Sequence, residues 1–148
     1  MPPRHSSVLF HVPAKGVRRR DLQQFARELQ HDVAHGRAFT CLITSDEELR
    51  RWNREFRKKD TPTDVLSFPP DGSTESAGEI AISFDRAQAQ AVEHGHDTSA
   101  EIRILLLHGV LHLLGLDHER DSGQMARTER RWRKRLGLPV GLIERVSA

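Results

Sequence analysis

The chain has 148 residues, 36% of them hydrophobic and 30% charged, and a formal net charge of only +2. This length fits one domain with a hydrophobic core, so we predict a single domain over residues 1–148, and no apolar run approaches the ~20 residues needed to cross a membrane. The N-terminus lacks the apolar core of a signal peptide and the single cysteine, Cys41, excludes an intrachain disulfide, so we expect a cytoplasmic protein without a membrane partner.

Hydrophobic periodicity and turn residues predict four strands and about five helices. In chain order we expect a strand at 8–12, a helix at 17–35, a strand at 38–44, a helix from the capping box of Ser45 and Glu48, a strand at 64–68, a polar loop at 71–77, a strand at 78–84, a helix from an Asp85 cap to His94, a long apolar helix from Thr98 or Ser99 to Gly115, and an Arg-rich helix from Asp121 or Ser122 to about Gly137. This order predicts an α+β (α/β-like) domain with one small, mixed, four-stranded sheet.

The long apolar helix carries a constellation that predicts a metal site. His108 and His112 are four residues apart, so their side chains lie on one helix face, one turn apart. Gly115 permits a left-handed turn that ends the helix and returns His118 to the same place. Three neutral imidazoles and an open fourth position are the ligand set of a catalytic zinc site, so we predict one zinc ion per chain on a helix in the core. The alternative is that these are core histidines that bond to backbone carbonyls. This explanation would have to apply separately to each of the three histidines, in the most apolar segment of the chain.

Two neighbours of these histidines bear on the chemistry. Asp117 would either fix the tautomer of a ligand histidine or cap the turn before His118. Gly109 occupies the position that carries the general-base glutamate in zinc proteases with an HExxH motif, which argues against peptide hydrolysis. We expect Gly109 to leave open space beside the metal.

Most basic residues are arginine, and they cluster. The clusters lie at Arg18–Arg20, Arg50–Lys59 and Arg127–Arg135. Guanidinium groups suit phosphate oxygens, although solvated helix faces would give the same pattern. Three clusters around a metal site favour a polyanionic substrate. The loop at Arg57–Thr63 would deliver a cation to the end of a strand, although a basic polar connection would look the same.

The segments Arg57–Pro69 and His108–His118 together resemble the YbeY family of bacterial endoribonucleases and ribosomal RNA maturation factors. The HGxLHLxGxDH run of that family matches His108–His118 in full, and its PTDVLSFP run matches Pro62–Pro69. Gly78-Glu79-Ile80 resembles the Gly-Asp-Ile opening of a family strand, with glutamate in place of aspartate. The resemblance covers the chain from roughly the second strand to the last helix.

The resemblance implies a function and roles for particular residues. It implies a zinc held by His108, His112 and His118, and Arg57 as the functional arginine beside it. It also implies cleavage of single-stranded RNA in maturing the 3′ end of small-subunit ribosomal RNA and in ribosome quality control, by a cytoplasmic protein associated with the small ribosomal subunit and its proteins. Further candidate residues are Asp117 and Glu79, as groups that assist the metal or the reaction, and Arg54, Lys58 and Lys59, as RNA contacts.

Two other functions stay open at this stage. The first is a non-catalytic ribosome-assembly factor whose zinc is structural and whose arginines bind ribosomal RNA. A fourth ligand from His94 or His96 would favour it, as would unfolding when metal is removed. The second is a metalloprotease with an unusual base, against which Gly109 and the family resemblance both argue.

Overall fold

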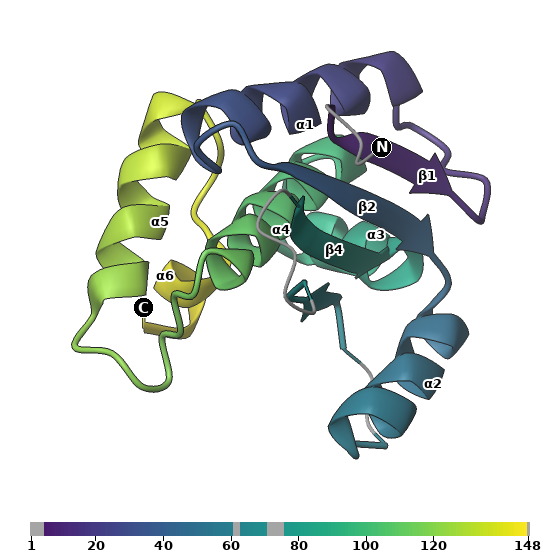
Figure 1. Cartoon of the computed structure of the whole chain (residues 1–148). Helices are drawn as coiled ribbons and strands as arrows, with labels where there is room; N and C mark the ends of the chain where they lie inside the picture. Colours follow the sequence, from purple (N-terminus) through teal and green to yellow (C-terminus); the bar gives the residue numbers. More distant parts are fainter. Residues whose placement is uncertain (1–4, 61–62, 71–75, 148) are drawn as a thin grey trace.

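The computed structural model describes residues 5–60, 63–70 and 76–147 (Figure 1). Its four strands are β1 (Ser7–Phe10), β2 (Ala38–Thr44), β3 (Val65–Phe68) and β4 (Ser76–Ser83). They form one sheet in the order β1-β2-β4-β3, in which β1, β2 and β4 are parallel and β3 is antiparallel to β4. The predicted α+β class with a mixed four-stranded sheet is therefore confirmed.

Six helices lie in the described part of the chain. They are α1 (Arg19–Asp32), α2 (Asp46–Arg57), α3 (Phe84–His94), α4 (Thr98–Leu113), α5 (Gln124–Arg135) and α6 (Leu142–Ser147). The sequence predicted the first five, and α6 is an addition. None of the described helices is long and apolar enough to cross a membrane.

Strand alternation divides the sheet into two different faces. Ile80 and Ile82 of β4 join the main core with α1 and α4, whereas Ala81 between them belongs to a small cluster under α2. The main core therefore lies on one face of the sheet, and α2 covers part of the other.

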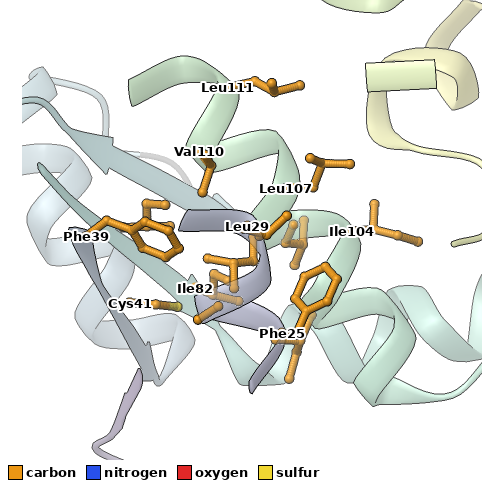
Figure 2. Packing of buried hydrophobic residues seen from close by; sticks show 14 of the residues in the cluster. Phe25, Leu29, Phe39, Cys41, Ile82, Ile104, Leu107, Val110 and Leu111 are labelled. Carbon is orange, nitrogen blue, oxygen red and sulfur yellow. The ribbon is translucent and has the colours of Figure 1, made fainter. Parts of the chain in front are cut away.

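Helix α4 runs through the main core, as predicted (Figure 2). Its residues Ile104 to Leu107 and Val110 to Leu111 are all at most 1% exposed. Each such side chain contributes roughly 1.5–3 kcal/mol by leaving water. Cys41 of β2 is fully buried in this core, and burial raises the pKa of its thiol to about 12. The position of α4 is thus fixed by packing, which makes its last turns a rigid base for a site.

The helix starts differ from the predicted ones by one or two residues. Ser83, not Asp85, caps α3 by accepting a hydrogen bond from the Arg86 N–H, and Asp97, rather than Thr98 or Ser99, caps α4. The reason is the same at both: the residue just before the first turn has the extended backbone of an N-cap. Of the predicted polar loop 71–77, residues 71–75 lie outside the described residues, and the other two belong to β4.

Candidate metal centre

Three imidazoles meet at the C-terminal end of α4. His108 and His112 project from consecutive turns of the helix, and their Nε2 atoms are 3.2 Å apart. His118 joins them from the following loop, and one ligand atom from each residue lies within 4.8 Å of the others. Two nitrogen ligands of a tetrahedral zinc ion, each at ~2.05 Å, would be roughly 3.3 Å apart. The arrangement therefore fits a small divalent cation, and we call these three residues the triad.

A turn at Gly115 places His118 beside His108 and His112. Gly115 has a φ of +94°, in the left-handed region where a side chain would be strained. The N–H of Leu116 then bonds to the carbonyl of Leu111, which closes the end of the helix. The carbonyl of Asp117 accepts hydrogen bonds from two following backbone N–H groups, so the chain folds round at His118.

The triad is open on one side. His108 is buried, His112 is half-buried and His118 is exposed. Burial and the neighbouring charges of His108 and His118 lower the pKa of His112, which keeps its imidazole neutral near pH 7. A neutral imidazole is the form that binds a metal, and a site open toward His118 has room for a further ligand.

A buried glutamate contacts the triad from α5. Glu129 Oε2 lies 2.6 Å from His108 Nδ1, and the carboxylate is 1% exposed. Glu129 is not among the residues predicted for the site, because it lies among arginines in the sequence. Its helical spacing was the available signal. Met125, Glu129 and Trp132 are four and three residues apart, so all three face the core on one side of α5.

A cavity of about 520 Å³ opens beside the triad. All three histidines line it, together with Arg57 at the end of α2, Asp117 and residues from β3. The loop after α4 and the C-terminal end of α2 thus both line one hollow. Its other lining residues are Thr63, Asp64, Val65, Ser67, Pro69, Glu119 and Leu142.

Comparison with known proteins shows the family. The model of the family described as endoribonuclease YbeY matches residues 14–137. The chain belongs to the YbeY family. It is 58% identical to endoribonuclease YbeY of Solibacter usitatus over 99% of this chain and 98% of that protein, and 48% identical to endoribonuclease YbeY of Koribacter versatilis over 95% and 91%. It is also similar to the solution structure of TM1509 from Thermotoga maritima, with a TM-score of 0.60 and 26% identity over 85% of each chain.

Two of the YbeY motifs form the cavity. The histidine run supplies the triad and Asp117. The described part of the second run, Thr63–Pro69, supplies the β3 wall, whereas Pro62 lies outside the described residues. Arg57 is the last residue of α2, and Lys58 ends the helix in the left-handed conformation.

The third YbeY motif does not reach the triad. Glu79 is exposed and lines a separate groove with Trp52 and Phe56, on the sheet face away from α4. Its neighbour Ile80 occupies the face toward α4, and alternation along β4 sends Glu79 the other way. The structure therefore gives no support to Glu79 as a group beside the metal.

Gly109 also has a different role from the expected one. A Cβ atom at this position would lie 2.9 Å from Cγ2 of Ile80, and the Gly109 carbonyl accepts a hydrogen bond from the Ser67 hydroxyl at 3.1 Å. The expectation of open space beside the metal was wrong, because Ile80 fills that space. The glycine lets α4 approach the sheet closely.

The structure does not bring a fourth histidine to the triad. Among the described residues, the group that could hold a metal consists of the three triad histidines. His96 is engaged elsewhere, with its Nε2 2.6 Å from Glu101, and His94 stacks on His96.

The three basic RNA-contact candidates are exposed near Arg57. Arg54 lies on α2 with its guanidinium 3.9 Å from Asp60, and Lys58 and Lys59 follow the helix. We call these three exposed residues the cationic rim, of which Arg54 lines a separate hollow with Arg50 and Asp60.

Proposed function

We propose that this chain is a zinc-dependent endoribonuclease that cleaves single-stranded RNA in the cytoplasm. Its proposed tasks are maturation of the 3′ end of small-subunit ribosomal RNA and ribosome quality control, in association with the small subunit. One observation carries the proposal: in a member of the YbeY family, Arg57 and three converging imidazoles line one open cavity.

The imidazoles of His108, His112 and His118 would hold the metal. When bound, a zinc ion supplies Lewis acidity, which lowers the pKa of water to about 7 and polarises a phosphoryl oxygen. The donor set is neutral and nitrogen-only, which suits zinc but also other divalent ions of the first transition row.

Arg57 would bind the phosphate. Arg57 lines the cavity that holds the triad, and a guanidinium can donate two parallel hydrogen bonds to non-bridging oxygens. Charge grows on those oxygens in the transition state, so a fixed cation stabilises the transition state more than the ground state.

Of the three carboxylates that line the cavity, Asp64, Asp117 and Glu119, the last two are candidates for proton transfer. Asp117 and Glu119 both line the cavity, and they flank His118 in the chain. Asp117 also accepts a hydrogen bond from the Glu119 N–H at 3.0 Å, which fixes its orientation. We propose Asp117 as the group that assists the reaction.

The cationic rim would hold the flanking phosphates. Arg54, Lys58 and Lys59 are exposed and are close neighbours of Arg57 in the chain. RNA binding that depends on phosphate contacts weakens as the salt concentration rises. Each contact contributes about one unit to the slope of log affinity against log salt concentration.

Cleavage of a labelled single-stranded ribosomal RNA fragment tests this function. Wild type, His112→Ala and the control His94→Ala are purified identically, since His94 lies near the triad but outside it. We expect cleavage by wild type and His94→Ala and none by His112→Ala. Equal cleavage by all three would assign the activity to a contaminant. Binding of RNA without cleavage by any of them would favour the assembly-factor function instead.

The ends of the product RNA test the chemistry. A 5′-phosphate or a 3′-phosphate formed directly indicates attack by water, which the proposed metal site favours. A 2′,3′-cyclic phosphate would show that the RNA 2′-hydroxyl attacks first and would contradict a hydrolytic first step.

A further inference from the structure

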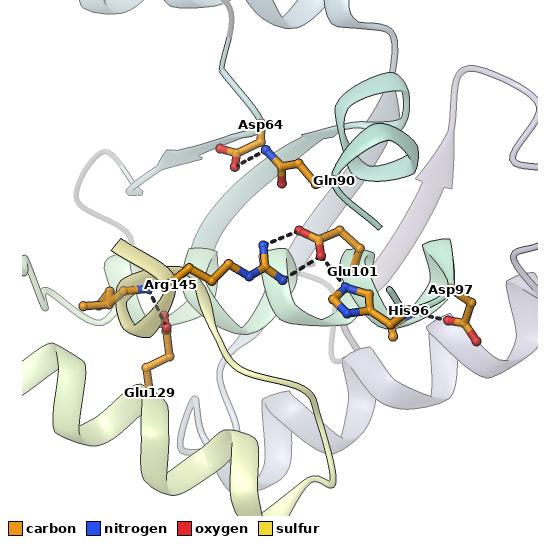
Figure 3. Close-up of polar contacts among 9 residues, drawn as sticks. Asp64, Gln90, His96, Asp97, Glu101, Glu129 and Arg145 are labelled. Atoms are coloured by element: carbon orange, nitrogen blue, oxygen red, sulfur yellow. Dashed lines mark hydrogen bonds and ion pairs between the residues drawn. The ribbon is translucent and has the colours of Figure 1, made fainter. Parts of the chain in front are cut away.

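Glu129 is the most buried carboxylate that touches the triad. It lies on the inner face of α5, at 1% exposure, and both of its oxygens accept hydrogen bonds. Oε2 faces His108 Nδ1 at 2.6 Å, and Oε1 accepts from the Ile143 N–H at 3.1 Å. Figure 3 shows Glu129 reaching from α5 toward the C-terminal chain near Arg145.

This contact determines which nitrogen of His108 carries the proton. A carboxylate with two acceptor oxygens requires the Nδ1 atom to be the donor. The lone pair of the neutral ring is then on Nε2, the atom that faces His112 Nε2 at 3.2 Å. We propose that Glu129 is a positioning residue that holds His108 in the metal-binding tautomer, and that the C-terminal segment, residues 141–145, holds Glu129 in turn. The proposal rests on the metal site of the proposed function.

The charge of Glu129 supports the same role. Within the part of the chain that the structure describes, no lysine or arginine forms a salt bridge with it, and its side-chain partner is the ring of His108. A buried carboxylate without a compensating charge is costly, by several kcal/mol. A cation held by the triad supplies that compensation through the imidazole, which links metal affinity to the carboxylate.

The C-terminal segment is tied to two helices. The guanidinium of Arg145 binds both oxygens of Glu101 on α4, at 2.9 and 2.7 Å, and Figure 3 shows this pair. Arg133 of α5 binds both oxygens of Glu144, at 2.6 and 2.9 Å. These pairs anchor the two residues that follow Ile143, whose N–H donates to Glu129.

The carboxylate of Glu129 lies directly against Gly141. A Cβ at this position would overlap Oε1 of Glu129 and lie 2.9 Å from its Cδ. A side chain at 141 would therefore displace the carboxylate without removing its charge.

Zinc affinity of Glu129→Gln tests the proposal, and the control is Glu28→Gln, which replaces an exposed glutamate on α1. An amide has one oxygen, so it cannot accept from both Ile143 and Nδ1 of His108. If its NH2 group turns to His108, Nδ1 becomes the acceptor and the proton moves to Nε2, where it blocks the metal. We expect zinc affinity, measured by competition with a chromophoric chelator, to fall by about 10- to 100-fold in Glu129→Gln and to stay within about threefold in Glu28→Gln.

Three outcomes decide the matter. Wild-type affinity in Glu129→Gln overturns the proposal and leaves the proposed function intact. Wild type that binds no zinc overturns both. If Glu129→Gln does not fold, 15N NMR of histidine-labelled, zinc-loaded wild type decides instead. There we expect Nε2 ligation and a proton on Nδ1 of His108, and ligation through Nδ1 would overturn the proposal.

Discussion

Replacing Arg145 with alanine removes the tie between the C-terminal segment and α4. Burial alone would raise the pKa of the Glu101 carboxyl, but hydrogen bonds from Arg145 and His96 outweigh it, so the pKa is lowered and the group is charged at neutral pH. Glu101 is fully buried, so the substitution leaves a buried carboxylate with only His96, at 2.6 Å, as its ionic partner among the described residues.

The expected loss of unfolding free energy is large for a single ion pair, that of Arg145 with Glu101. Breaking a buried ion pair by removing one partner costs ~3–5 kcal/mol, and His96 compensates in part, so we expect about 3 kcal/mol. For a chain of this size, that lowers the melting temperature by about 6–12 °C.

Urea unfolding of Arg145→Ala beside Arg50→Ala measures this difference. Arg50 bonds to Asp60 at 3.0 Å, but both side chains are about half exposed, at 51% and 55%. We expect this control to lose less than ~1 kcal/mol. Equal losses in the two variants, or less than ~1 kcal/mol for Arg145→Ala, would refute the claim that the C-terminal segment is anchored by a buried charge pair.

Three further predictions concern the site itself. Arg57→Ala should lower kcat/KM by about 100-fold without changing the melting temperature. Lys59→Ala should mainly reduce the salt dependence of RNA binding, by about one unit in the slope of log affinity against log salt concentration. Steady-state kinetics at several salt concentrations distinguish the two effects. The pKa of His112 is lower in the folded protein than in the unfolded chain. Its contribution to the stability of the metal-free protein is therefore fully present above the unfolded pKa near 6.5 and is lost as pH falls toward the folded pKa. Urea unfolding between about pH 7.5 and 5.5 should show a steeper loss of unfolding free energy in wild type than in His112→Gln. Gly109→Ala should cost ~1–3 kcal/mol because its Cβ meets Ile80, and an unchanged unfolding midpoint would contradict the close contact of α4 with the sheet.

The sequence predicted the parts of the site that depend on local geometry. His108 and His112 follow from helical spacing, and the return of His118 follows from a left-handed turn at Gly115. The sheet and its strands were predicted for a similar reason, since each strand has its own alternation and turn residues. The placement of Arg57 beside the triad came from the family resemblance, because residues on different elements cannot be paired by spacing.

The parts that failed depend on which way a side chain faces in three dimensions. Glu129 is 21 residues from His108 and was hidden by the arginines around it, although its phase with Met125 places it on the inner face of α5. Glu79 was assigned by motif, yet its neighbour Ile80 takes the face toward α4. Helix α6 lies in a short tail after the last expected element, where the contacts of Arg145 and Ile143 with α4 and α5 hold it, and these contacts are not local.

Metal titration tests the central claim most directly. Chelator-treated protein is dialysed, its fold is checked by circular dichroism, and zinc is added while bound metal and cleavage of single-stranded RNA are both followed. We predict a folded metal-free protein that does not cut, and cleavage that rises in proportion to bound zinc until one ion per chain is reached. Full cleavage by protein that holds almost no metal would contradict the account, and so would unfolding of the whole chain when the metal is removed.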